Sequence, residues 1–148
     1  MKRICLEFPN KMQIHATLLE KEEPELCESL WDFIEEEQHF ICHNTLSTGY
    51  SFAAFPRPTR SPNTDSHLAN PIGRNKIGYT KLKCGDLIWS GSKLYVVYGT
   101  CTEPSIAGAV TAIVDSEELD ALVAAGLNVW DHTYYYHKLA VLKVRREV

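Results

Sequence analysis

Residues 83–99 read KCGDLIWSGSKLYVVYG, and this stretch predicts two β-strands joined by a tight turn. β-Branched and aromatic residues fill both halves, and Ser90-Gly91-Ser92 lies where the backbone must reverse. A Gly-Asp turn precedes the first strand, and Gly99 ends the second. The polar loop that follows, residues 100–105, carries one carboxylate, Glu103. The hairpin therefore predicts a β-rich fold with a site beside its exit loop.

The length and composition of the chain are those of an ordinary globular protein. Its 148 residues fit a single domain, 1–148, which at this size buries about 68–70% of the unfolded surface, enough for one core. The formal net charge of −4 comes without a basic stripe, so we expect no nucleic-acid partner. No apolar run approaches the roughly 18 residues that cross a bilayer, and the N-terminus has no apolar signal segment. We therefore expect no membrane partner and a cytoplasmic location.

The cysteines also favour a cytoplasmic location. They are odd in number and widely spaced, and no Cys-x-x-Cys pair is present, which is typical of reduced thiols in a cytoplasmic protein. We expect neither a metal site nor a cofactor. The five are Cys5, Cys27, Cys42, Cys84 and Cys101.

Alternating apolar and polar residues predict further strands, and residues 3–8 and 12–19 form an N-terminal hairpin around a Pro-Asn-Lys turn. A helix follows, with Pro24 in its first turn and an apolar stripe at helical spacing. The other predicted strands cover residues 39–46, 50–55, 76–82 and 107–114.

The C-terminal third predicts a second helix and a closing strand. Asp115 and Glu118 are spaced like a capping box that begins a helix over 116–125, and Gly126 is placed to end it. The aromatic segment 133–144 then predicts a long strand. A mainly β order with two helices, without alternating βα units, predicts a closed or nearly closed barrel.

A long irregular loop interrupts this pattern at about 56–76. Four of the seven prolines fall in it, together with several Asn, Asp, Ser and Gly residues. Loops of this length inside a compact domain are usually functional lids or disordered segments, and the sequence leaves both open.

Three segments resemble the small bacterial cyclophilin-like proteins. They are the hairpin start Ile4-Cys5-Leu6-Glu7-Phe8, the acidic helix start Glu23-Pro24-Glu25, and the hairpin from Gly85-Asp86 to Tyr98-Gly99. The resemblance covers most of the chain outside the long loop and implies a cyclophilin-like closed barrel. The same superfamily includes the cucumopine and mikimopine synthases, which condense histidine with 2-oxoglutarate and cyclise the imine without a cofactor.

The sequence departs from these relatives in two ways that limit the activity and domains that we expect. The Phe-His-Arg and Gln-Gly-Gly-Asp segments of true peptidyl-prolyl isomerases are missing, so we do not expect isomerase activity. The opine synthases also carry an additional helical domain after the barrel, and we expect this chain to lack it.

Four residues are candidate catalytic groups. Glu103 could serve as a general base, against the alternative of an exposed loop glutamate. Tyr50 could donate a hydrogen bond to a carboxylate or oxyanion, or be an ordinary strand aromatic. His43 could shuttle protons or be a wall histidine, and Lys93 could bind a carboxylate or carry a proton, or be a solvated turn lysine.

Candidate substrate-binding residues surround them. Arg57, Arg60 and Arg74 bracket the long loop, and such arginines can clamp a dicarboxylate through bidentate hydrogen bonds. Tyr98 ends the second strand of the hairpin beside the exit loop, and Tyr134 lies in the aromatic segment predicted to line a pocket.

These residues favour a cofactor-independent enzyme that performs general acid–base chemistry on an anionic carbonyl or imine metabolite, similar to the opine synthases. The alternative is a non-catalytic small-molecule-binding or oligomeric scaffold protein of the same fold, and a homo-oligomer is possible in either case. A third hypothesis, amide hydrolysis by Cys101, has no local signature, and a buried small hydrophobe is the competing interpretation of that residue.

Overall fold

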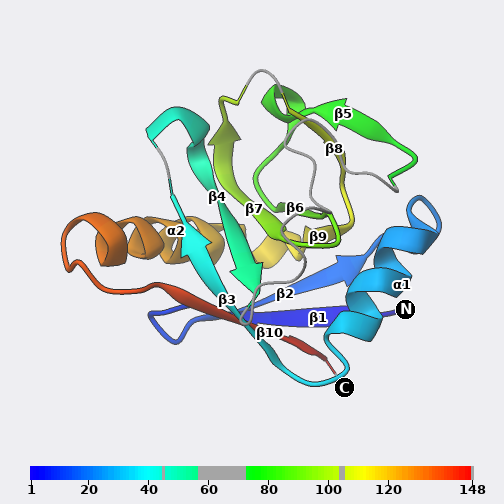
Figure 1. The fold of residues 1–148 in the computed structure, drawn as a ribbon, viewed down its shortest axis with the longest axis horizontal. Coiled ribbons are helices and arrows are strands. Elements are labelled where there is room, and N and C mark those ends of the chain that lie inside the picture. The colour runs from blue at the N-terminus through cyan, green and yellow to red at the C-terminus, as the bar shows by residue number, and fades with distance from the viewer. Residues whose placement is uncertain (45, 57–72, 104–105, 148) are drawn as a thin grey trace.

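Eight antiparallel strands form a closed barrel in the order β1-β10-β3-β4-β7-β6-β9-β2 (Figure 1). The computed structural model describes residues 1–44, 46–56, 73–103 and 106–147. The barrel strands are β1 (Arg3–Glu7), β2 (Gln13–Leu18), β3 (Gln38–His43), β4 (Gly49–Pro56), β6 (Asp86–Trp89), β7 (Leu94–Cys101), β9 (Ala112–Val114) and β10 (Val141–Arg146).

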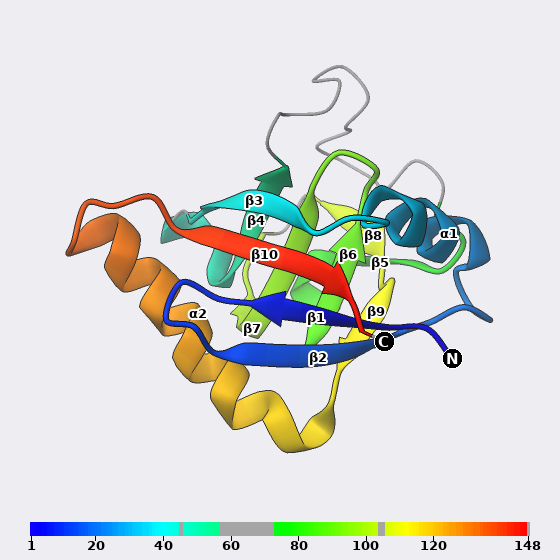
Figure 2. The ribbon, with the colours of Figure 1, turned by 90° about the horizontal axis from the view of Figure 1, so that it is seen from below.

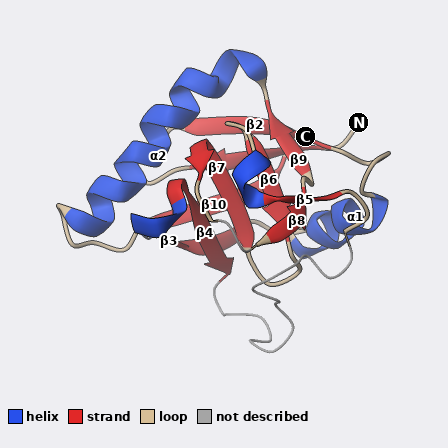
Figure 3. Ribbon diagram, turned by 90° about the horizontal axis from the view of Figure 1, so that it is seen from above, coloured by secondary structure: helices blue, strands red, loops and turns tan. Residues whose placement is uncertain are grey.

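The other elements lie around this barrel. Strands β5 (Lys76–Gly78) and β8 (Ala107–Ala109) pair as a separate small sheet. Helices α1 (Pro24–Phe33) and α2 (Leu119–Tyr134) lie on opposite sides of the barrel (Figures 1 and 3). Three short 3-10 turns complete the described chain, at Leu46–Thr48, Tyr79–Lys81 and Ser116–Glu118. In the described ranges no helix combines the length and apolarity needed to cross a membrane.

The hairpin predicted from residues 83–99 is confirmed as β6 and β7. Leu87 pairs with Val96 and Trp89 with Leu94, and β7 also pairs with β4. Gly85 and Gly91 have φ of +97° and +95°, a conformation that other residues adopt at a cost. The hairpin is therefore one of the central parts of the barrel wall.

Strand alternation in β7 separates two apolar layers. Leu94, Val96 and Tyr98 belong to the barrel core, whereas Tyr95 and Val97 pack in a second cluster with residues of the 3-10 turn at 79–81 and the segment after β8. In β2 the alternation also has one inward face, since Ile14, Ala16 and Leu18 are buried.

Helix α1 forms as its sequence predicts and closes part of the core. Leu26, Cys27 and Leu30 are buried along one face. The indole of Trp89 stacks on Phe33 with ring centroids 5.2 Å apart and donates Nε1–H to the Ser29 hydroxyl at 3.0 Å. The largest buried side chain of the hairpin is thereby held against the helix.

Helix α2 differs from the prediction. The helix does not end at Gly126 but continues to Tyr134, and the closing strand is limited to β10. Glycine at this position serves packing, because a Cβ there would lie 2.1 Å from Cγ of Tyr98. The prediction of a strand from 133 to 144 was wrong because aromatic side chains favour strands only as a propensity. Here Trp130 and Tyr134 pair at helical i,i+4 spacing with ring centroids 4.3 Å apart.

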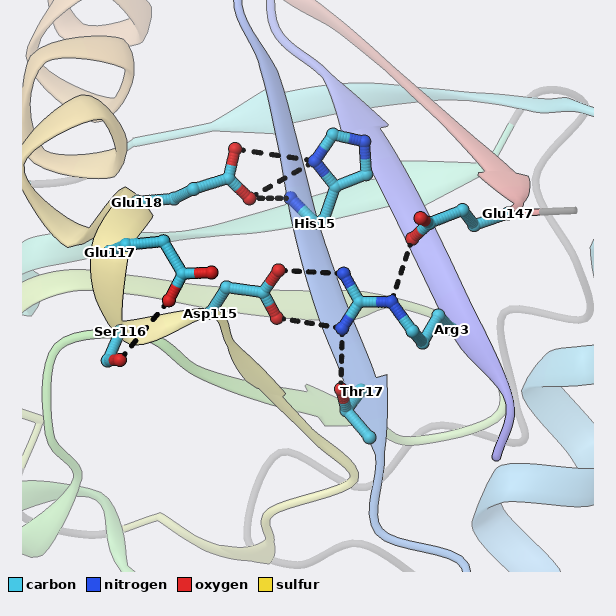
Figure 4. A network of polar contacts seen from close by, with 8 residues as sticks. All are labelled: Arg3, His15, Thr17, Asp115, Ser116, Glu117, Glu118 and Glu147. Atoms are coloured by element: carbon cyan, nitrogen blue, oxygen red, sulfur yellow. Dashed lines mark hydrogen bonds and ion pairs between the residues drawn. The ribbon is translucent and has the colours of Figure 1, made fainter.

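The predicted capping box is also wrong, because both carboxylates have partners far away in the sequence (Figure 4). Asp115 forms no cap hydrogen bond and accepts two from the guanidinium of Arg3, at 2.9 and 2.7 Å. Glu118 accepts the backbone N–H of His15 at 2.9 Å, and its Oε1 lies 3.1 Å from Nδ1 of that ring. The segment before α2 is thus tied to β1 and β2.

Two predicted strands are shorter than expected. Residues 76–82 divide into β5 and a 3-10 turn. Residues 107–114 divide into β8 and β9 at Thr111, where the chain crosses from the small sheet to the barrel. The buried Thr111 hydroxyl accepts the backbone N–H of Trp89 at 3.0 Å, so the break in the strand leaves that donor satisfied.

The Gly126 contact predicts an unusual response to alanine. In an exposed helix, Gly→Ala stabilises by about 1 kcal/mol, but here the new methyl group meets the buried ring of Tyr98. We expect Gly126→Ala to lower the free energy of unfolding, since overpacking costs about 1–3 kcal/mol. Urea unfolding measures this. Gly78→Ala is the matched control, since its Cβ would meet nothing within 4 Å, and a stabilised Gly126→Ala variant would contradict the packing argument.

The Arg3–Asp115 pair predicts a pH-dependent stability. Hydrogen bonds from Arg3 hold the pKa of Asp115 below its ordinary value, and its side chain is only 17% exposed. The folded protein therefore takes up this proton at lower pH than the unfolded chain, so the stabilisation is complete above about pH 4 and is lost as pH falls through the folded-state pKa. We expect Asp115→Asn to cost about 1–2 kcal/mol at pH 7 in urea unfolding, because the paired groups are partly exposed.

The difference between wild type and Asp115→Asn should shrink steadily below pH 4. Glu117→Gln, which neutralises an exposed carboxylate in the same turn, is the control. A wild-type advantage that stays constant down to pH 2 would show that the carboxylate charge is not what Arg3 recognises.

Candidate functional site

A cleft of about 410 Å³ lies between the ends of β4 and β7 and helix α2. The side toward the strands is lined by Gly49, Tyr50 and Tyr98, and the side toward the helix by Leu127 and Trp130. This volume falls within the range of small-molecule pockets. We call it the aromatic cleft.

Local backbone features place Tyr50 at this cleft. The β4–β7 register shifts between Gly49 and Ser51, which leaves Tyr50 at an irregular position. Gly49 has φ of +75°, and a Cβ there would lie 2.7 Å from the carbonyl oxygen of Thr100. Across the pair, a Cβ on Gly99 would lie 2.6 Å from that of Tyr50, so the tyrosine occupies the space that the glycine leaves. The Tyr50 side chain is 55% exposed, and a ligand can reach it.

Tyr98 forms the deep part of the strand side. Its ring centroid lies 6.1 Å from that of Tyr50, edge to face, and 6.1 Å from that of Phe52 in the core. Burial, with a smaller contribution from Tyr50, raises the pKa of Tyr98 to about 12. The phenol therefore stays protonated at neutral pH and can act as a hydrogen-bond donor.

The helix side of the cleft is held by the last turns of α2. Trp130 stacks against Tyr134, whose hydroxyl donates to the backbone oxygen of Asn44 at 3.0 Å. Leu127, one turn earlier, is partly exposed. The helix thus presents an indole and an aliphatic side chain to the two tyrosines.

Some of the predicted site residues lie at this cleft, and others lie elsewhere in the structure. Tyr50 and Tyr98 line it, and Tyr134 borders it through Trp130. Glu103 is not among the lining residues. The residue before it, Thr102, donates its N–H to the backbone oxygen of Thr48 at 3.2 Å and its hydroxyl to the backbone oxygen of Ser47 at 2.6 Å. Since Ser47 and Thr48 lead directly into Gly49, Glu103 belongs to the same end of the barrel.

His43 and Lys93 lie elsewhere. His43 is exposed at the end of β3, with its ring centroid 6.4 Å from that of Phe55. Lys93 is only 8% exposed, so the interpretation as a solvated turn lysine was wrong. Five residues of extended chain, roughly 16 Å, separate it from Tyr98 along β7. Their catalytic roles stay predictions.

The predicted arginine anchors are also outside the cleft. Arg57 and Arg60 lie outside the described residues. Arg74 forms an ion pair with Glu25 at the start of α1. The carboxylate of Glu23, which is buried, accepts the backbone N–H groups of Arg74 and Asn75 at 2.7 and 2.6 Å. These contacts tie residues 74–75 to the start of α1.

A second polar group lies on the other face of β7. The Ser51 hydroxyl is 2.7 Å from that of Tyr95, which is 3.5 Å from Sγ of Cys101. All three are buried, and burial raises the pKa of Tyr95 well above its usual value. Cys101 is 4% exposed, as the interpretation of a small buried hydrophobe predicts. Within the described ranges no three His, Cys, Asp or Glu side chains are grouped so as to hold a metal ion.

Sequence reasoning missed the helix side of the cleft. Leu127 and Trp130 follow Gly126, where the local signals predict the end of the helix, so the pattern gives them no place in a site. Their i,i+3 spacing, continued by Tyr134, was the available signal.

The sequence matches no protein-family model and no curated protein at a significant level. Among solved structures, one of McbB in complex with tryptophan is similar, with a TM-score of 0.82 and 23% sequence identity over 97% of this chain and 44% of that chain. This chain therefore spans less than half the length of that one. The likeness shows the fold: the closed eight-stranded barrel with two helices is a cyclophilin-like barrel, as the sequence predicted.

Proposed function

We propose that this chain is a small-molecule enzyme that binds an aromatic amine in the aromatic cleft and condenses it with an anionic carbonyl compound. The cleft itself carries the proposal. Its lining is aromatic and aliphatic apart from two phenol hydroxyls, and no described lining residue is charged. The similar structure of McbB, which holds tryptophan, supports an aromatic ligand.

The shape of the cleft suits a flat ring. Tyr50 and Tyr98 are arranged edge to face on one side, and Trp130 faces them from the helix. A planar ring inserted between the two sides would contact the accessible rings of Tyr50 and Trp130, with the buried Tyr98 behind them, and such aromatic contacts add to the gain from burial. A purely aliphatic anion would gain less binding free energy from this lining.

The chemistry proposed is that of the opine synthases, transferred to this cleft. The amine adds to the carbonyl carbon and one water leaves, which forms an imine. A ring carbon of the aromatic group then bonds to the imine carbon, the imine nitrogen takes up a proton, and the ring carbon loses its own. This sequence needs one general base and one proton donor, and no redox change.

Two residues at this end of the barrel fit these roles. Glu103 is the base that removes the ring proton, because the Thr102 contacts hold the chain beside the cleft entrance. Tyr50, which is exposed at the entrance, is the donor to nitrogen. The proton returns from Glu103 to the phenol through solvent, so both groups are restored.

The binding part of the proposal predicts a role for Trp130. Calorimetric titration with tryptophan should give saturable binding to the wild type, and Trp130→Ala should weaken it by about tenfold or more, because a buried aromatic contact is lost. Tyr135→Ala removes an exposed aromatic residue at the same helix end and is the control. Equal affinities for wild type and Trp130→Ala would place the ligand elsewhere.

The catalytic part predicts a condensed product. Wild-type protein is incubated with 2-oxoglutarate and either tryptophan or histidine, and mass spectrometry follows a product equal to the two reactants minus one water. We expect Glu103→Gln to reduce the rate by about 10²–10⁴-fold, the usual contribution of a general base, while Glu117→Gln leaves it unchanged. Full activity in Glu103→Gln would refute the assigned mechanism. Tryptophan binding without turnover would favour the non-catalytic binding protein.

A further inference from the structure

A reciprocal pair of hydrogen bonds holds the chain where the 3-10 turn at 46–48 leads into β4. The Ser51 hydroxyl donates to the backbone oxygen of Thr48 at 2.8 Å, and the Thr48 hydroxyl donates to the backbone oxygen of Ser51 at 3.3 Å. The two residues enclosed by these bonds are Gly49, with its φ of +75°, and Tyr50, and both line the aromatic cleft. The pair therefore fixes the backbone that presents Tyr50 to the cleft.

The Thr48 carbonyl also holds the exit loop of the hairpin. Its oxygen accepts the backbone N–H of Thr102 in addition to the Ser51 hydroxyl, so both of its lone pairs are used. Thr102 directly precedes Glu103 in the chain. The segments that carry Tyr50 and Glu103, the proposed proton donor and base, are thus joined at one backbone oxygen.

The donors and acceptors behind this oxygen follow from counting hydrogens. Ser51 has one hydroxyl hydrogen, and the Thr48 carbonyl takes it because a carbonyl cannot donate. The Tyr95 hydroxyl, 2.7 Å from Oγ of Ser51, therefore donates to it and accepts from the Cys101 thiol at 3.5 Å. Ser51 is 0% and Tyr95 5% exposed, so the chain of donors runs through the protein interior to the edge of the cleft.

We propose that Ser51, supported by Tyr95, is a positioning residue that holds Tyr50 and Glu103 in their places at the cleft. The inference rests on the proposed function and adds what fixes the separation of the donor and the base. Neither Ser51 nor Tyr95 is a lining residue of the cleft. Proton transfer needs heavy atoms within about 2.6–3.2 Å, and a misplacement of about 1 Å can cost 10²-fold in rate, whereas apolar contacts tolerate such shifts.

Kinetics and binding measured together test this role. We expect Ser51→Ala to lower kcat for the condensed product of tryptophan and 2-oxoglutarate by about 10- to 100-fold, while calorimetric titration shows tryptophan affinity changed less than threefold. Tyr95→Phe removes the donor to Ser51 but keeps the ring against Tyr79, with centroids 4.7 Å apart, and should lower kcat by a smaller factor, about two- to tenfold.

Thr111→Val is the matched control. It removes another fully buried hydroxyl of the barrel, one that bonds the backbone N–H of Trp89 on the side of α1. This variant should be less stable than the wild type but keep its kcat. Loss of kcat in Ser51→Ala together with full kcat in Thr111→Val separates positioning from a general loss of stability.

Hydrogen exchange of the Thr102 amide, followed by NMR, gives a readout that does not depend on turnover. Ser51→Ala should speed this exchange about two- to tenfold, the range for the loss of one hydrogen bond, and Thr111→Val should leave it unchanged. Unchanged exchange in Ser51→Ala would refute the link between Ser51 and the exit loop.

The outcomes separate the two proposals. If the wild type forms product and Ser51→Ala retains its kcat, or loses tryptophan affinity as strongly as kcat, the proposed function stands and the positioning role is refuted. If the wild type forms no product, the catalytic proposal fails and this inference fails with it. Thermal unfolding shows whether each variant is folded, and Tyr95→Phe decides the comparison if Ser51→Ala is not.

Discussion

The backbone of helix α2 lies directly on the ring of Tyr98, and the barrel end is organised around this contact. Only glycine at position 126 leaves room for it, since a Cβ would come within 2.1 Å of the ring. The ring in turn supports Tyr50 and Phe52, and the helix carries Trp130 along its next turn. A larger residue at 126 would separate the two sides of the cleft together with the core beneath them.

Strand alternation places neighbouring side chains of β7 on opposite faces of the barrel wall, in different surroundings. Along β7, Tyr98 faces the barrel end and the cleft, whereas Tyr95 faces the outer cluster and contacts Ser51 and Cys101. Neighbouring tyrosines with the same chemistry therefore belong to different environments. Both rings are buried, but Tyr98 backs the cleft beneath the exposed Tyr50, whereas Tyr95 is bonded to protein groups on the other face.

The barrel was predictable because its signals are local. Alternation in β2, the β-branched and aromatic residues of β7 and the glycine turns of the hairpin specify strands wherever they lie in the fold. The extent of α2 was not predictable in this way, since Gly126 and the run of tyrosines have the local signals of a helix end and a strand. The contact with Tyr98, formed only in the folded chain, overrides them. The same limit applies to the site: Tyr50 was predicted from the start of a strand and Tyr98 from the hairpin, but Leu127 and Trp130 lie beyond the point where the local signals end the helix.

The seam between β1 and β10 also constrains how the molecule assembles. Ile4 pairs with Arg146, and Arg3 contacts Glu147, so residues more than 140 positions apart close the barrel (Figure 2). Contacts of such sequence separation form late, because the entropy of closing the intervening chain is lost before they contribute. During synthesis the first hairpin must wait with an unpaired edge until the last strand has emerged. That interval is when the chain is most open to strand-mediated association with other copies.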